Sequence, residues 1–220
     1  MKETFRNIFV VVIVLLMPVL LLSFFTHIVA FDTQFQANQL ARLRVPEEFA
    51  PGVASVEAER IVEYLHGDTV LNREFLNDKE VAHLVDVKEL LVKNKRIAII
   101  LACVVAFSAV MLAIMRKWVA IASAFKWAGI FTTMLLCLLL IVLSVGFESL
   151  FISFHEVTFS NDLWMLDPAT DSLINLFPEQ FFVAVAMRIF LLAIVSAVFI
   201  GGLGWIAEWV LKQKLIYADS

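Results

Sequence analysis

Two short stretches of the sequence contain side chains that can transfer a proton. Glu80, His83 and Asp86 recur every three residues, which places them on one face of a helix. His155 stands next to Glu156 in a Phe-rich stretch. Imidazole titrates near neutral pH, so a histidine with carboxylate neighbours suits general acid–base catalysis. A histidine alone is more often structural, and the plainer interpretation of the triplet is a solvated helix face.

Metal-dependent and serine-nucleophile chemistry are less well supported. Imidazole and carboxylate are common metal ligands, but the sequence has no HExxH pattern, and Cys103 and Cys137 lie inside apolar blocks. No G-x-S-x-G elbow is present either. We therefore expect no metal ligands and no cofactor.

Arg188 is an ionisable residue inside an apolar block. It lies seven residues after Phe181, or roughly 10 Å along a helix that rises 1.5 Å per residue. Because burying its charge in the membrane is costly, we treat Arg188 as a candidate functional residue. The structural alternative is an ion pair with Glu148 or a contact with a backbone carbonyl.

The composition of the chain predicts an all-α, polytopic membrane protein. Of its 220 residues, 61% are hydrophobic and 17% are charged, and the mean hydropathy is +0.89. A helix of about 20 apolar residues crosses a bilayer core. Four such blocks are present, at about 8–30, 97–115, 129–151 and 181–210, and we expect them to form one membrane domain. Glycines at 201, 202 and 204 could serve close helix packing or a dimer contact, and small residues favour close packing.

The basic residues of the short loops predict the orientation. Lysine and arginine occur near the N-terminus, between the second and third blocks, and near the C-terminus, at Lys2, Arg6, Arg116, Lys117, Lys126, Lys212 and Lys214. The segment 152–180 has neither. By the positive-inside rule, both termini are cytoplasmic, and 31–96 and 152–180 are extracytoplasmic. The net charge of −4, without a basic tail, excludes nucleic acid as a partner.

The first outer segment is predicted to contain two helices. Val53–His66 has an apolar stripe and ends at Gly67, a residue that commonly terminates helices. The second helix starts near Asn77, where Glu80 occupies the position of a capping-box carboxylate.

The second outer segment is predicted to follow the membrane surface. Asp167-Pro168 indicates a turn, and Asp171 begins a short helix. Trp164 fits an interfacial aromatic belt.

Two stretches resemble one known family. They are FLNDKEVAHLVDVKELL, residues 75–91, and FHEVTF…W…DPATDSLINLFPEQFF, within residues 154–182. Together with the number and order of the apolar blocks, they resemble the lipoprotein intramolecular transacylases, four-span membrane enzymes of bacteria. The resemblance implies acyl transfer from the sn-2 position of a lipoprotein's diacylglyceryl group to the α-amino group of its N-terminal cysteine. The product is a lyso-form lipoprotein.

The resemblance also implies roles for particular residues. The family histidines fall on His83 and His155, and the motif acid falls on Asp86. We expect His155 to be the general acid–base, His83 to orient it or complete a relay, and Asp86 to fix an imidazole tautomer. Direct transfer and a covalent acyl-histidine intermediate are both open at the level of the sequence. Arg188 and backbone N–H groups are candidates for stabilising the oxyanion. The other polar and aromatic residues of the two stretches are expected to contact substrate, namely Glu80, Glu156, Trp164 and Asp171.

The implied partners are diacylglyceryl-modified lipoproteins and membrane lipid, in the bacterial cytoplasmic membrane with the active site at its outer face. Two other functions remain open at this point. One is a non-catalytic membrane scaffold or accessory protein, and the other is a metal-dependent lipid hydrolase. Mass spectrometry of a lipoprotein's N-terminal peptide distinguishes the three functions. A transacylase would give an N-acylated peptide, a scaffold would leave the peptide unchanged, and a hydrolase would give a deacylated peptide.

Overall fold

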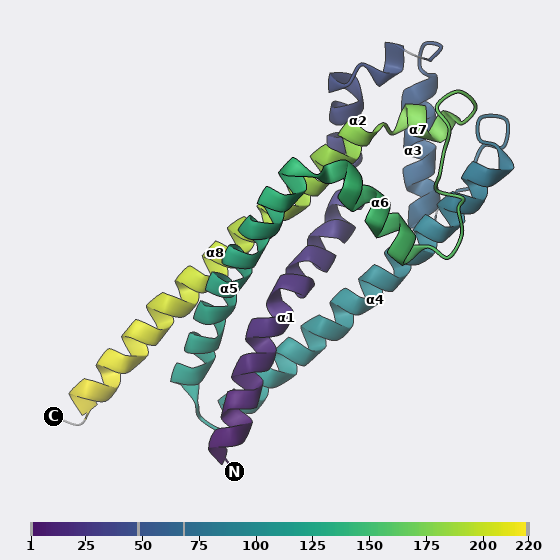
Figure 1. The fold of residues 1–220 in the computed structure, drawn as a ribbon. Coiled ribbons are helices and arrows are strands. Elements are labelled where there is room, and N and C mark those ends of the chain that lie inside the picture. The colour runs from purple at the N-terminus through teal and green to yellow at the C-terminus, as the bar shows by residue number, and fades with distance from the viewer. Residues whose placement is uncertain (1, 48, 68, 219–220) are drawn as a thin grey trace. The chain divides into compact units, whose positions relative to one another are not determined.

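The computed structural model describes residues 2–47, 49–67 and 69–218, and these residues form helices and connections without any strand. Figure 1 colours these elements from purple at the N-terminus to yellow at the C-terminus. The helices are α1 (Lys2–Ala30), α2 (Thr33–Arg42), the 3-10 turn η1 (Val45–Glu47), α3 (Val53–His66), α4 (Asp78–Ile114), α5 (Trp118–Val145), α6 (Phe147–Thr158), α7 (Ser172–Leu176) and α8 (Glu179–Ala218). The predicted all-α fold is confirmed.

Four of the described helices are long and apolar enough to cross a membrane. They are Glu3–Ala30, Asp78–Ile114, Trp118–Val145 and Glu179–Ile216. The apolar block predicted at 129–151 is interrupted, because the backbone at Gly146 leaves the helical region and α6 starts anew at Phe147. His155 therefore belongs to a separate helix of twelve residues.

The chain divides into two compact units. The first contains residues 1–25, 95–141 and 189–220, which are stretches of α1, α4, α5 and α8. Its core is formed mainly by aliphatic side chains and small residues. Gly129 of α5 and Gly201 of α8 lie so close that a methyl group at Gly129 would collide with the backbone of Gly201. Gly204 meets the backbone at Lys126 in the same way, whereas Gly202 faces open space. The predicted close packing is confirmed at positions 201 and 204.

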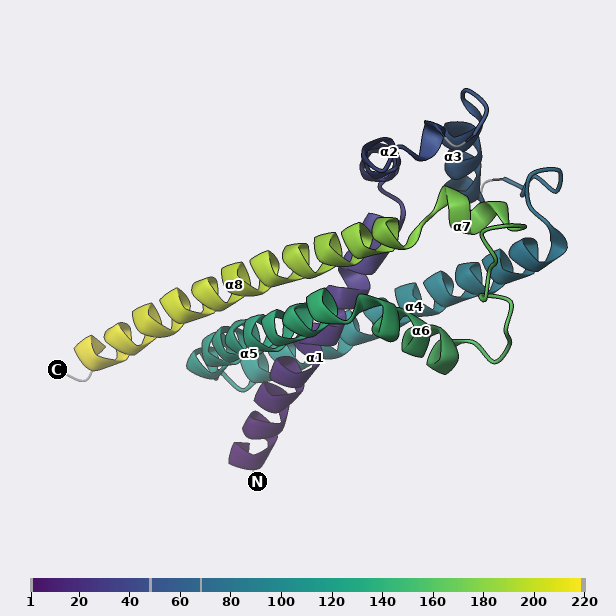
Figure 2. The same cartoon turned by 45° about the horizontal axis from the view of Figure 1, so that its top comes forward.

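The second unit contains residues 26–94 and 142–188 and carries both candidate histidines. Its core joins α3 and the start of α4 to α7, through Ala58, Ile61, Leu84, Leu173 and Leu176. Figures 1 and 2 both show α7 beside α3. The helix predicted at Val53–His66 is confirmed, and Gly67 ends it with a φ of 113°, a value that favours glycine.

Candidate active site

The beginning of α4 is held by the predicted capping box. The Asn77 side chain accepts a hydrogen bond from the Glu80 N–H at 3.0 Å, and Glu80 accepts one from the Asn77 N–H at 2.7 Å. The second carboxylate oxygen of Glu80 accepts a hydrogen bond from the Leu173 N–H at 2.6 Å. Glu80 therefore connects the first turn of α4 to the first turn of α7.

The face of α4 that carries Glu80 and His83 is buried, so the interpretation as a solvated face is wrong. Glu80 is 1% exposed and His83 is 8% exposed. A polar helix face is ordinarily expected to point to solvent. Here it is covered instead, by α7 at Glu80 and by α6 at His83. Val85 and Val92 of the same helix, although apolar, are more than one third exposed.

His155 lies on α6 and is held in one tautomer by the backbone. Its Nδ1 is 2.6 Å from the carbonyl oxygen of Phe151, one turn earlier. A carbonyl oxygen only accepts, so Nδ1 carries the proton and Nε2 keeps its lone pair. Burial lowers the pKa of His155 below its ordinary value of 6.5, although the hydrogen bond to Phe151 acts in the opposite direction. The ring is therefore neutral at pH 7, with Nε2 ready to accept a proton.

The two histidines face each other in an aromatic environment. Their ring centroids are 6.2 Å apart, with 37° between the planes. The ring centroids of Phe151 and Trp164 lie 4.2 Å and 4.9 Å from that of His155. The Phe159 ring contacts both imidazoles. Nδ1 of His83 is buried without a hydrogen-bond partner among the described residues. A buried imidazole nitrogen in this state is available to a substrate group or a water molecule.

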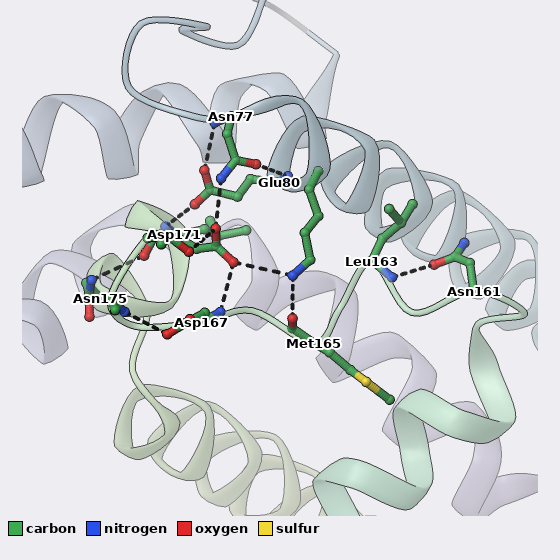
Figure 3. A network of polar contacts seen from close by, with 12 residues as sticks. Asn77, Glu80, Asn161, Leu163, Met165, Asp167, Asp171 and Asn175 are labelled. Carbon is green, nitrogen blue, oxygen red and sulfur yellow. Dashed lines mark hydrogen bonds and ion pairs between the residues drawn. The ribbon is translucent and has the colours of Figure 1, made fainter.

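Asp171 holds the loop before α7 against α4, as Figure 3 shows. It is 4% exposed and accepts hydrogen bonds from the Asn77 side chain at 2.8 Å and from the Asp167 N–H at 2.8 Å. The Asp167 N–H lowers the pKa of Asp171 most strongly, followed by further donors including Asn77. Lys79 lies 3.5 Å from its carboxylate and also donates to the Met165 carbonyl at 2.5 Å. The ionised Asp171 thus fixes the segment that brings Trp164 onto His155.

Asp86 is engaged by a residue that the sequence analysis missed. The Asn161 side chain donates to the Asp86 carboxylate at 2.9 Å and accepts from the Leu163 N–H at 3.1 Å. Neither imidazole hydrogen-bonds to Asp86 in the described chain, and the tautomer of His155 is set by the Phe151 carbonyl instead. The Ser-Asn-Asp run before Leu163 is typical of a turn. This turn pattern is the sequence feature from which a structural role of Asn161 could have been predicted.

Arg188 is paired with a different carboxylate from the one considered in the sequence analysis. Its guanidinium lies 2.6 Å from Asp32 and 4.1 Å from the centroid of the Phe35 ring, while Glu148 is exposed. Asp32 also caps α2 by accepting from the Phe35 N–H at 2.9 Å. Arg188 therefore links α8 to the beginning of α2. Within the part of the chain that the structure describes, it makes no polar or ring contact with His83 or His155.

The remaining candidates differ in their surroundings. Glu156 is exposed on α6, and Trp164 is half-buried against His155. In the ranges 2–47, 49–67 and 69–218, no group of three or more His, Cys, Asp or Glu side chains is placed to hold a metal ion. The geometry provides a neutral base, a second imidazole and an aromatic wall.

Comparisons with known proteins identify the family. A model of the lipoprotein intramolecular transacylase Lit matches residues 10–182. The solved structure of the membrane integral Lit of Bacillus cereus is 21% identical, with a TM-score of 0.82 over 97% of this chain and 99% of that one. A variant of it with one histidine changed to arginine gives a TM-score of 0.79 at 20% identity, over 97% and 96% of the two chains. No curated protein matches the chain.

Four apolar helices and a family model that covers both histidines define an integral membrane transferase. The matched range contains the α4 face, α6 and the loop that carries Trp164. The chain belongs to the lipoprotein intramolecular transacylase family, and the scaffold interpretation is therefore wrong.

Proposed function

We propose that this enzyme transfers the sn-2 acyl chain of a diacylglyceryl-modified lipoprotein to the α-amino group of its N-terminal cysteine. The observation that carries the proposal is the state of His155, a buried neutral imidazole whose Nδ1–H is held by the Phe151 carbonyl. Its Nε2 can therefore act only as the base and, once protonated, as the acid. Acyl transfer from an ester to an amine requires both steps in turn.

The chemistry balances with no cofactor. The amine nitrogen attacks the ester carbonyl carbon while His155 Nε2 removes a proton from it, and a tetrahedral oxyanion forms. The bond from that carbon to the sn-2 oxygen then breaks, and the imidazolium returns the proton to the departing alkoxide. The products are an amide at the cysteine and a free sn-2 hydroxyl. Because donor and acceptor belong to one molecule, positioning supplies a large part of the rate advantage.

The surrounding residues are assigned by their contacts. His83, whose buried Nδ1 has no partner in the described chain, hydrogen-bonds the substrate and orients it toward His155. Trp164 and the exposed Glu156 contact the substrate from the rim of the site. Glu80 and Asp171 are positioning residues, since their carboxylate oxygens already bind groups of the protein. Asp86 positions Asn161 and its loop, and Arg188 positions α2.

The site is proposed to face the outer surface of the bacterial cytoplasmic membrane, with both termini inside. The second unit supports this, because it consists mainly of the two segments predicted to be extracytoplasmic. A reporter fused at Asp171 is expected to be active only outside, and one at the C-terminus only inside. A cytoplasmic signal at Asp171 would contradict the orientation.

The test of function is the mass of the N-terminal lipopeptide. A lipoprotein is co-expressed with the enzyme in cells that lack any other N-acylating enzyme. An N-acylated peptide with one ester chain is expected. An intact diacylglyceryl peptide would contradict the transfer, and a deacylated peptide without an amide would indicate a hydrolase.

A further inference from the structure

One end of the first unit contains a cavity of about 640 Å³ that we call the basic pocket. Three separate parts of the chain contribute cations to its lining, which are Arg6 of α1, Arg116 and Lys117 of the α4–α5 turn, and Lys212 and Lys214 of α8. The apolar side chains of Trp118, Leu211 and Leu215 also line it. Trp118 and Leu215 are more than half exposed. The pocket therefore combines positive charge with an apolar rim.

The charge of the basic pocket is not neutralised by the protein. Glu208 is the one carboxylate in the lining, and its two oxygens lie 2.5 Å from Lys126 and 2.7 Å from Lys212. Arg6 is paired at 2.8 Å with Glu3, which is not a lining residue. Arg116, Lys117 and Lys214 make no ion pair within the described ranges of the chain. Three cations therefore face the cavity without a counter-ion from those residues.

Arg116 adopts a backbone conformation that a side chain disfavours. Its φ is 57°, in the left-handed region. The Lys117 N–H donates to the Leu112 carbonyl at 2.9 Å and the Arg116 N–H to the Ala113 carbonyl at 2.8 Å, the paired bonds of a Schellman helix end. Glycine is the usual residue at this position because it has no Cβ. The positive-inside rule requires only a positive charge somewhere near this turn. It does not explain why the residue with a φ of 57° is an arginine.

We propose that the basic pocket binds a phosphate anion. Arginine matches the geometry of phosphate oxygens with two parallel N–H groups, and lysine adds point charges. Basic pockets between membrane helices bind anionic head groups in this way. A phospholipid head group and a free phosphate share this chemistry. The apolar rim formed by Trp118, Leu211 and Leu215 suits the lipid, because its acyl chains need an apolar path away from the head group.

The test uses the full-length enzyme in a neutral detergent at low ionic strength. Thermal unfolding is followed while phosphatidylglycerol, phosphatidylcholine or inorganic phosphate is added. Phosphatidylglycerol is expected to raise the Tm, and phosphatidylcholine, whose choline offsets the phosphate charge, is not. One basic residue near an anionic surface is worth about fivefold in affinity. The half-saturating lipid concentration is therefore expected to rise about fivefold in Arg116→Gly.

Arg116→Gly separates loss of binding from loss of folding. Glycine suits a φ of 57°, so the Tm without lipid is expected to be unchanged or higher. The control is Lys95→Gln, which removes the same charge from an exposed position of α4 outside the pocket and is expected to leave the lipid response unchanged.

A Tm increase with phosphatidylglycerol alone supports the pocket with a lipid as the source of phosphate. A similar increase with inorganic phosphate supports the pocket with a free anion as the source. The proposal is overturned if phosphatidylglycerol acts no better than phosphatidylcholine and inorganic phosphate has no effect. It is also overturned if the response of Arg116→Gly to phosphatidylglycerol and phosphate equals that of Lys95→Gln.

Discussion

The replacement of His155 by glutamine separates proton transfer from hydrogen bonding. Glutamine places an amide near the position of Nε2 but cannot carry a proton at neutral pH. General acid–base catalysis typically contributes about 10²–10⁴-fold to the rate, or about 3–5 kcal/mol of the barrier. His155→Gln is therefore expected to lose at least a hundredfold in transfer rate.

The stability cost of this change is much smaller. The bond from Nδ1 to the Phe151 carbonyl is a single hydrogen bond, and a typical hydrogen bond is worth about 1 kcal/mol. In a chain of 220 residues this shifts the Tm by only about 2–4 °C. Asparagine at position 155 is the matched control, because its amide can still donate to Phe151 but cannot reach the position of Nε2. We expect similar activity loss in both variants and a smaller Tm loss in His155→Asn.

The assay is the mass of the N-terminal lipopeptide, followed over time in cells with no other N-acylating enzyme. Recovery from detergent as a monodisperse species and the Tm show that each variant is folded. His83→Gln is expected to retain more activity than His155→Gln, since an orienting hydrogen bond can be partly replaced. Near-normal conversion by folded His155→Gln would refute the assignment of His155 as the base.

Three further predictions follow from the site. His155 is expected to titrate below pH 6.5, because burial lowers its pKa; an NMR titration of the ring in the substrate-free enzyme checks this, and a midpoint above pH 7 would contradict it. A strong chelator is expected to leave the activity of the purified enzyme unchanged, and a loss that zinc restores would reassign the histidines and their carboxylates as ligands. Arg188→Ala and Asp32→Asn are each expected to cost about 1 kcal/mol of stability, because their ion pair is partly exposed and asparagine keeps the N-cap of α2, and to lower activity equally; a loss more than tenfold greater in Arg188→Ala, measured on folded protein, would show that Arg188 stabilises the oxyanion.

Local features of the site were predictable from the sequence. The capping box of Asn77 and Glu80 spans four residues, and its bonds depend on the helix end alone. Gly67 ends α3 as expected, and Asp171 precedes α7. Such features depend on neighbours within one turn, which the sequence displays directly.

Features that depend on distant partners were not predictable from periodicity. Helical periodicity showed which side of α4 is polar but not that this side is covered, since the Leu173 N–H that meets Glu80 lies 93 positions away. The Asp32 partner of Arg188 is 156 positions away, whereas the partner considered in the sequence analysis, Glu148, is much nearer in sequence. The pairing of His83 with His155 came from the family resemblance and not from their spacing.

The bond between Glu80 and the Leu173 N–H also limits how early this part of the structure can assemble during synthesis. Ribosomes add about 5–20 residues per second, so the 93 positions between these partners take about 5–20 s to synthesise. During that interval Glu80 has no partner on α7, and the loop that places Trp164 against His155 does not yet exist. A nascent chain arrested after α6 therefore contains both histidines but lacks Leu173 and the loop that packs Trp164 against His155.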